Sequence, residues 1–178
     1  RSFDNVVNFE IQPYKGVDVV GVAEQLPFKD NTFELVVSLA VLEHVKDPMK
    51  AALEMQRVIK PGGLLWIDAG FMQPYHGYPS HYYNLTQQGL ENLLQENMEI
   101  IRNEVPRYGT PIWSLTWIVS RYTDSLPRQA REQFLELSIS ELLKSPEILC
   151  EKEWATQLPE EARKEMAATV SILATKKY

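Results

Sequence analysis

The sequence predicts an α/β fold built on a parallel sheet, and the first half of the chain carries the evidence. Short apolar runs alternate there with turn residues, and the run at 33–39 (FELVVSL) is almost continuously apolar. A continuous apolar run is typical of a strand that is buried on both faces, as strands of parallel sheets are. Strands that alternate with helices at this spacing indicate βαβ units.

Four strands are expected in this half, in the order in which the chain presents them. The runs that predict them are 5–11 (NVVNFEI), 17–22 (VDVVGV), 33–39 and 64–67 (LLWI). The first run carries an acid, Glu10, close to its end, and a turn at 13–16 (PYKG) separates it from the second.

One helix is expected between the third and fourth strands. Asp47 is a suitable N-cap, and Pro48 suits the first helical turn because its missing N–H needs no partner there. Apolar residues from Met49 to Ile59 recur at helical spacing. The sequence Pro61-Gly62-Gly63 is expected to end the helix before the fourth strand begins.

The second half of the chain differs from the first in composition and periodicity. Residues 71–84 (FMQPYHGYPSHYYN) are rich in aromatic residues, Pro and His, and they have no helical or strand period. Residues 113–168 are expected to be mainly helical, as an insertion that serves as a lid or an interface, and 169–175 (TVSILAT) as a last strand. The whole of 1–178 is interpreted as one domain.

Composition excludes several classes of protein. The 178 residues include 18 Lys and Arg against 24 Asp and Glu, so the net charge is 18 − 24 = −6, which argues against nucleic-acid binding. The sequence has no run of about 18 apolar residues, so no membrane span is expected, and a cytoplasmic protein is the expectation. Cys150 is the one cysteine, so neither an internal disulfide nor a cysteine-based zinc site can form.

The segment 21–63 reads GVAEQLPFKDNTFELVVSLAVLEHVKDPMKAALEMQRVIKPGG. Its motifs are, in order, Ala23-Glu24, Leu26-Pro27-Phe28, Phe33-Glu34, Leu42-Glu43-His44-Val45, Asp47-Pro48 and Glu54 through Gly63. This ordered set resembles the class I S-adenosylmethionine-dependent methyltransferases of the type 11 subfamily, over about residues 5–95. The resemblance implies a Rossmann-like sheet, S-adenosyl-L-methionine as cofactor, and methyl transfer to a small-molecule acceptor.

The resemblance also implies cofactor-binding residues at the carboxyl ends of the strands, where doubly wound sheets bind ligands. Glu10 would accept hydrogen bonds from the ribose, the alternative being a solvated charge at a strand end. Ala23 would offer its backbone to the adenine. The acid that usually precedes it is replaced by Val22, so Glu24 is the candidate substitute. Leu39 would face the methionine part of the cofactor.

Histidine and tyrosine side chains are the candidates for acceptor chemistry. His44 either carries a catalytic proton or fixes a loop by hydrogen bonding. In the aromatic-rich loop, His76 or His81 would remove a proton from a hydroxyl acceptor, and the loop's tyrosines would contact the acceptor: Tyr75, Tyr78, Tyr82 and Tyr83. No metal site is expected, because Gly77 and Pro79 keep the two histidines off a common helix face.

The glycine-rich loop and the first strand of the resembled family do not appear in this sequence, which starts at Arg1 without a signal peptide. Either the sequence was cut at its front or the protein is naturally short. The sequence is compatible with two alternative functions. The first is a methyltransferase acting on a sugar or a natural-product intermediate, with transfer to oxygen slightly favoured because the candidate bases are histidines. The second is a non-catalytic methyltransferase-like module for binding or assembly, and self-association into a homo-oligomer stays open.

Overall fold

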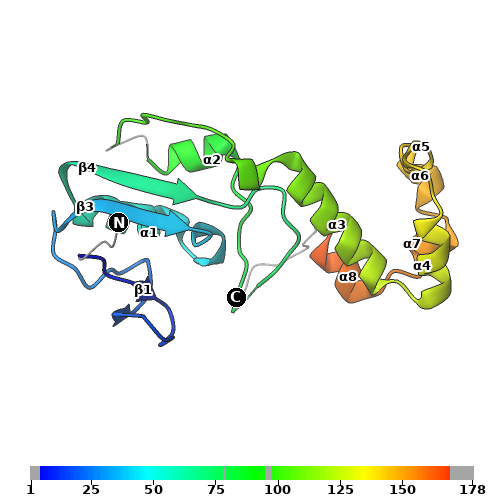
Figure 1. Cartoon of the computed structure of the whole chain (residues 1–178), viewed down its shortest axis with the longest axis horizontal. Coiled ribbons are helices and arrows are strands. Elements are labelled where there is room, and N and C mark those ends of the chain that lie inside the picture. Colours follow the sequence, from blue (N-terminus) through cyan, green and yellow to red (C-terminus); the bar gives the residue numbers. More distant parts are fainter. Residues whose placement is uncertain (1–4, 78, 95–97, 169–178) are drawn as a thin grey trace, which may run out of the picture. The chain divides into compact units, whose positions relative to one another are not determined.

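The computed structural model describes residues 5–77, 79–94 and 98–168 (Figure 1). The chain forms two compact units. Unit 1 comprises residues 1–71 with 77–104, and unit 2 comprises residues 72–76 with 105–178. Each is considered by itself below. In the part of the chain that the structure describes, no helix has both the length and the apolar character needed to cross a membrane.

The first two strands of unit 1 form a short parallel pair. β1 (Phe9–Glu10) runs beside β2 (Val19–Val20), with Glu10 opposite Val20. The amide of Gly21 donates to the Glu10 carbonyl at 2.9 Å and closes the pair. Both strands lie inside the expected runs but are shorter, because the chain leaves the ladder on either side of the turn, where Gly16 has a positive φ of 91°.

The second parallel pair is longer and contains the expected βαβ unit. β3 (Phe33–Leu39) has the predicted bounds, and β4 (Ile59–Asp68) lies beside it in parallel register (Figure 1). A 3₁₀ turn, η1 (Leu42–His44), and the helix α1 (Pro48–Val58) connect them. The Asp47 carboxylate accepts the Lys50 amide at 3.0 Å, which confirms the predicted cap.

The expected boundary between helix and fourth strand is wrong. Pro61-Gly62-Gly63 was expected to separate them, but α1 ends at Val58 and β4 already begins at Ile59. The pairing shifts register between Phe33 and Leu35, so the glycines form an irregularity inside the strand. Gly62 takes a positive φ of 77°, and a Cβ on Gly63 would lie 2.9 Å from the Glu34 carbonyl oxygen. Both positions therefore favour glycine within the strand.

One face of the β3–β4 pair is buried and the other is not. Val36, Leu65 and Ile67 pack against the apolar cluster of α1, which includes Ala51, Ala52 and Met55. The alternate side chains on the opposite face are about half exposed: Leu35, Val37, Leu39, Leu64 and Trp66. The run 33–39 was expected to be buried on both faces, and among the described residues it is covered on one. We call the exposed set the open sheet face.

Unit 2 is helical, as expected for this region. Its long helix is α3 (Pro111–Ser125), which the 3₁₀ turn η2 (Arg107–Gly109) precedes. After it come α4 (Arg128–Leu135), α5 (Ile139–Leu142), α6 (Pro146–Leu149), α7 (Glu153–Thr156) and α8 (Glu160–Glu165). Phe134 packs edge-on against Trp154 at 5.3 Å between ring centroids, in a core with Leu126, Ala130, Leu158 and Ala162. The last expected strand, 169–175, lies outside the described residues.

Candidate functional site

The carboxyl ends of β1 and β2 lie at one edge of their pair because the strands are parallel. Glu10 ends β1 with an exposed side chain, and no hydrogen bond from the described residues reaches its carboxylate. Ala23 follows β2 and is 9% exposed, whereas Val22 before it is 46% exposed. This edge therefore offers an available carboxylate near one buried residue, Ala23.

The carboxyl end of β3 forms a strained turn. Ala40 has a φ of 52°, a left-handed conformation that residues with a Cβ adopt at an energetic cost. Its amide donates to the Asp68 carbonyl at 3.0 Å, which ties the turn to the end of β4. Leu39, the residue before it, is 54% exposed. The expected cofactor residue thus lies at the surface of the sheet edge.

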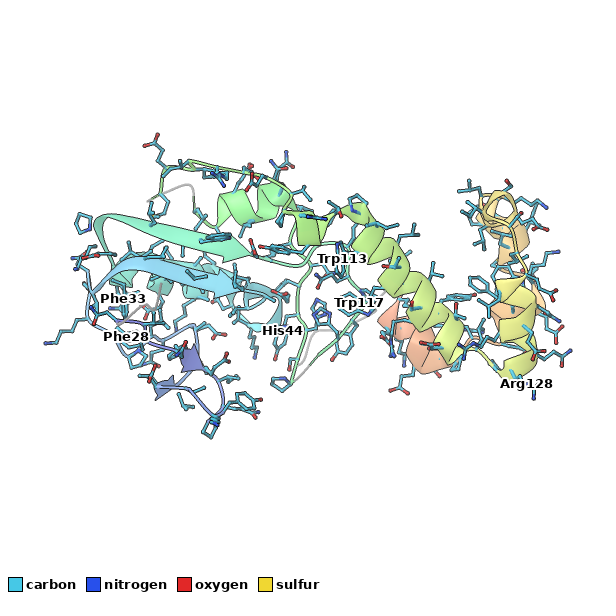
Figure 2. The ribbon with its side chains drawn as sticks, in the orientation of Figure 1. Phe28, Phe33, His44, Trp113, Trp117 and Arg128 are labelled. Atoms are coloured by element: carbon cyan, nitrogen blue, oxygen red, sulfur yellow. The ribbon has the colours of Figure 1, made fainter. Side chains whose placement is uncertain are left out.

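The 3₁₀ turn after β3 holds the second half of the aromatic loop. The Glu43 carbonyl accepts the amides of Tyr82 at 2.7 Å and Tyr83 at 3.3 Å. The His44 Nδ1 lies 2.7 Å from the Ser80 carbonyl oxygen, so it carries a proton and donates. This is the contact that a loop-fixing role for His44 requires. Figure 2 shows His44 at this end of unit 1.

His81 lies against His44, with 5.6 Å between ring centroids. Its Nε2 is 3.0 Å from the Tyr83 carbonyl oxygen and 2.9 Å from the Asn84 Oδ1. A carbonyl oxygen can only accept, so Nε2 carries a proton and donates. The tyrosines beside it are partly exposed, Tyr82 at 48% and Tyr83 at 42%, and the Tyr83 hydroxyl donates to the Lys46 carbonyl at 3.1 Å.

The other expected base belongs to unit 2. The His76 Nδ1 lies 2.8 Å from the Pro74 carbonyl oxygen, and the ring packs at a tilt of 50°, 5.0 Å between ring centroids, against Trp117 of α3, which Figure 2 labels. The Tyr75 amide donates to the Glu165 carbonyl at 2.8 Å. His76 and His81 thus take part in different units, and Tyr78 lies outside the described residues.

Glu24 has a local role in the structure. One of its carboxylate oxygens accepts the Lys46 amide at 3.1 Å, just before the cap of α1. The sequence suggested that Glu24 replaces the acid missing at Val22 beside the adenine. In unit 1 its carboxylate instead bridges the segment after β2 to the start of α1.

A second connection joins the same segment to the end of α1. Arg57 faces Glu54 with two hydrogen bonds, of 2.7 Å from Nε and 2.8 Å from Nη2. Hydrogen bonding to Arg57 is the main cause that lowers the pKa of Glu54, and bonding to Glu54 raises the pKa of Arg57. The guanidinium also donates to the carbonyls of Leu26 and Phe28. The spacing of Glu54 and Arg57 on one helix allows such a pair, but sequence spacing says nothing about partners outside the helix.

Glu43 is a further residue whose environment sequence reasoning missed. Its side chain is fully buried, with 0% exposure, and among the described residues neither carboxylate oxygen has a hydrogen-bond partner. Buried carboxylates are normally paired, since removing a charge from water is costly. The motif Leu42-Glu43-His44 gave no signal of this burial, because an acid beside a histidine is also common at an exposed turn.

Residues 3–67, a little over a third of the chain, match the family described as "Methyltransferase domain". An uncharacterized methyltransferase of Schizosaccharomyces pombe is 40% identical over 63 residues, which cover 35% of this chain and 23% of that protein. A ubiquinone/menaquinone biosynthesis C-methyltransferase of Haemophilus ducreyi is 40% identical over 86 residues, which cover 48% of this chain and 32% of that protein. The chain thus spans less than a third of the length of these two relatives.

The chain also resembles parts of solved structures, two of which are described as methyltransferases. A methyltransferase of Bacillus halodurans is 22% identical, with a TM-score of 0.43, over 51% of each chain. A methyltransferase of Thermotoga maritima is 26% identical, with a TM-score of 0.39, over 46% of this chain and 45% of that one.

Proposed function

Since the segment with β1 to β4 is related to class I S-adenosylmethionine-dependent methyltransferases, we propose that this chain carries the cofactor-binding part of such an enzyme. The family's cofactor is S-adenosyl-L-methionine, which when bound supplies an electrophilic methyl group on a positively charged sulfur. The observation that carries the proposal is the edge formed by β1 and β2. An available carboxylate, Glu10, and a buried residue, Ala23, lie at the ends of neighbouring parallel strands there, inside the matched residues.

The donor set at this edge fits the cofactor. The Glu10 carboxylate accepts the two ribose hydroxyls, because an ionised oxygen pair forms charge-assisted hydrogen bonds with both. The Ala23 backbone is assigned to the adenine edge, and Leu39 offers apolar contact at the end of β3. Glu24 is assigned to holding its own segment through the Lys46 amide and not to the adenine.

The acceptor residues of unit 1 are on the loop that η1 holds. His44 positions this loop through Ser80, and Tyr82 and Tyr83 provide exposed aromatic surface for the acceptor. We assign removal of the acceptor's hydroxyl proton to His81, which lies on this loop beside Tyr82 and Tyr83. The roles of His76, Tyr75 and Tyr78 stay predictions that site-directed variants would test.

The acceptor we propose is a small aromatic hydroxyl compound of the quinol class, methylated on a ring carbon. The names of the quinone-pathway relatives support transfer to carbon over the transfer to oxygen that the sequence slightly favoured. Removal of a proton from the acceptor hydroxyl makes the ring carbon next to it more nucleophilic. The balance is one methyl group gained by that carbon, one ring proton lost, and S-adenosylhomocysteine released.

Calorimetric titration of the folded chain with S-adenosylhomocysteine tests the cofactor part of this proposal. We expect one site, with competition by S-adenosylmethionine. An assay with labelled S-adenosylmethionine and either a quinol or a sugar acceptor then tests the acceptor class. A folded chain that binds neither cofactor form would support the second candidate, a non-catalytic binding module, which is favoured by the exposed Val22 where an acid is expected.

A further inference from the structure

The segment between β2 and β3 is fastened to α1 at two points. Near its start, Glu24 accepts the Lys46 amide at 3.1 Å, and the Gln25 amide donates to the Val22 carbonyl at 3.1 Å. Further along, the Leu26 amide donates to Glu54 at 2.9 Å. The residues that follow β2 are therefore held by side chains from outside the segment as well as by their own turn.

Arg57 is the centre of the second fastening point. Its Nη1 donates to the Phe28 carbonyl at 2.9 Å and to the Asp30 carboxylate at 2.7 Å, and its Nη2 donates to the Leu26 carbonyl at 3.1 Å. With the two bonds to Glu54, these contacts use all five N–H groups that a guanidinium has. A lysine offers three donors from one atom, so it cannot reproduce this arrangement.

The pair is ionised and partly shielded from water. The Arg57 side chain is 31% exposed and the Glu54 side chain 20% exposed. Arg57 lowers the pKa of Glu54, which keeps the carboxylate charged near neutral pH. Phe28, whose carbonyl Arg57 holds, also packs edge-on against Phe33 at 5.0 Å between ring centroids (Figure 2). The segment is thus anchored to both α1 and β3.

This arrangement bears on cofactor binding because the anchored segment contains Ala23. Ala23 is three residues before Leu26, and the backbone in between is already constrained by the turn at Val22. A backbone group that contacts a ligand contributes most when it is held in place before binding, since ordering a loop on binding costs affinity.

We propose that Glu54 and Arg57 are positioning residues for the cofactor, which fix the segment 22–28 so that the Ala23 backbone is preorganised for the adenine. The inference rests on the proposed function and extends it to two residues of α1 that contact the segment after β2. If the ion pair only stabilised the fold, breaking it would lower the melting temperature but would not separately weaken cofactor binding.

The test compares Arg57→Lys with Arg121→Lys in the full chain. Arg121 is a matched control, because it also makes two hydrogen bonds to one carboxylate, that of Glu165, at 2.7 and 2.8 Å, and it belongs to unit 2. Calorimetry measures the affinity for S-adenosylhomocysteine, thermal melting measures stability, and hydrogen exchange measures protection of the Leu26 amide without ligand. Glu54→Gln is a milder variant that keeps the chain folded if Arg57→Lys does not.

We expect Arg57→Lys to weaken S-adenosylhomocysteine binding at least tenfold and Glu54→Gln by a smaller factor, with faster exchange of the Leu26 amide in both. Arg121→Lys should lower the melting temperature to a similar extent and leave the affinity within twofold. Unchanged affinity in Arg57→Lys and Glu54→Gln would overturn the positioning role while leaving the proposed function intact. If the unaltered chain does not bind the ligand, the proposed function fails and this inference fails with it.

Discussion

The Tyr82 amide donates to the Glu43 carbonyl at 2.7 Å, and this bond fastens the aromatic loop to the turn after β3. The same glutamate buries its carboxylate completely, with no hydrogen-bond partner among the described residues. Its backbone and its side chain thus have opposite effects on stability. The backbone carbonyl holds a loop in place, whereas the unpaired carboxylate is costly to bury.

Glu43→Gln should therefore stabilise the chain. The amide keeps the shape of the side chain and avoids the cost of burying a carboxylate without a hydrogen-bond partner, so we expect the free energy of unfolding at pH 7 to rise by about 1 kcal/mol or more. Urea unfolding followed by circular dichroism measures it. Glu136→Gln is the control, because its side chain is exposed and the change should be within about 0.5 kcal/mol. A clear loss of stability in Glu43→Gln would mean that the carboxylate has a stabilising partner.

The Glu54–Arg57 pair should make stability depend on pH. Hydrogen bonding to Arg57 lowers the pKa of Glu54 below its usual 4.5 in the folded chain. The contribution is therefore fully present above the unfolded-state pKa and is lost as the pH falls through the folded-state value. We expect the stability difference between the unaltered chain and Glu54→Gln to be constant from pH 7 to 6 and to shrink below pH 4.5.

Urea titrations at several pH values measure this difference. Glu132→Gln is the control, because Glu132 forms an exposed pair with Arg128, with side chains 62% and 92% exposed, which should contribute little at any pH. A difference between the chain and Glu54→Gln that grows on acidification would contradict the assigned direction.

Glu10→Ala should weaken S-adenosylhomocysteine binding at least tenfold. Two charge-assisted hydrogen bonds to the ribose are together worth more than about 1.4 kcal/mol, which corresponds to one factor of ten in affinity. Calorimetry provides the measurement. Glu34→Ala removes another carboxylate, 85% exposed and near the start of β3, and should leave the affinity unchanged. Equal affinities of Glu10→Ala and the unaltered chain would refute the ribose role.

Gly63→Ala should destabilise unit 1. A Cβ at this position would lie 2.7 Å from the Ile59 Cγ2 and 2.9 Å from the Glu34 carbonyl oxygen, so the two strands would have to move apart. We expect a loss of about 1–3 kcal/mol in the free energy of unfolding. Gly16→Ala is the comparison, because its positive φ is strained for alanine but no atom lies within 4 Å of the added Cβ. A Gly63→Ala variant no less stable than Gly16→Ala would contradict this packing argument.

The open sheet face should bind the dye ANS, which fluoresces on apolar surface. Val37 and Trp66 are opposite each other on this face, 49% and 57% exposed. We expect the double variant Val37→Thr, Trp66→Thr to lose about half of the fluorescence, because contiguous exposed apolar patches are binding surfaces. Val105→Thr, which removes an apolar side chain outside this face, is the control. Fluorescence that stays at its original level in the double variant would place the dye elsewhere.

The sequence predicted the parts of the fold that depend on local chemistry. The Asp47 cap, the start of α1 at Pro48 and the bounds of β3 follow from side chains within a few residues, and the structure confirms them. The end of α1 was misplaced, because Pro61-Gly62-Gly63 is compatible both with a helix stop and with a kink inside a strand. The pairing with β3 decides between these, and pairing is not visible in a single segment.

For the candidate site too, some features could be predicted from the sequence and others depend on tertiary contacts. The placement of Glu10 and Ala23 at neighbouring strand ends follows from the parallel pairing of β1 and β2, which the family resemblance implied but the turn between the two runs did not. The attachment of Glu24 to Lys46 and of Arg57 to the segment after β2 depends on how α1 packs against a loop 20 or more residues earlier. Such contacts depend on tertiary structure and leave no periodic signal in the sequence.

The irregularity at Pro61-Gly62-Gly63 divides β4 into an irregularly paired start and a regularly paired remainder. From the pair Phe33–Ile59 to the pair Leu35–Leu64, the register advances by five positions on β4 but by only two on β3. The extra residues of β4 are accommodated at Pro61-Gly62-Gly63. After that point the ladder is regular to the pair Leu39–Asp68. A change in length at the end of α1 can therefore be absorbed in the kink, so the helix terminus can vary in evolution or engineering without moving the strand ends that carry the site.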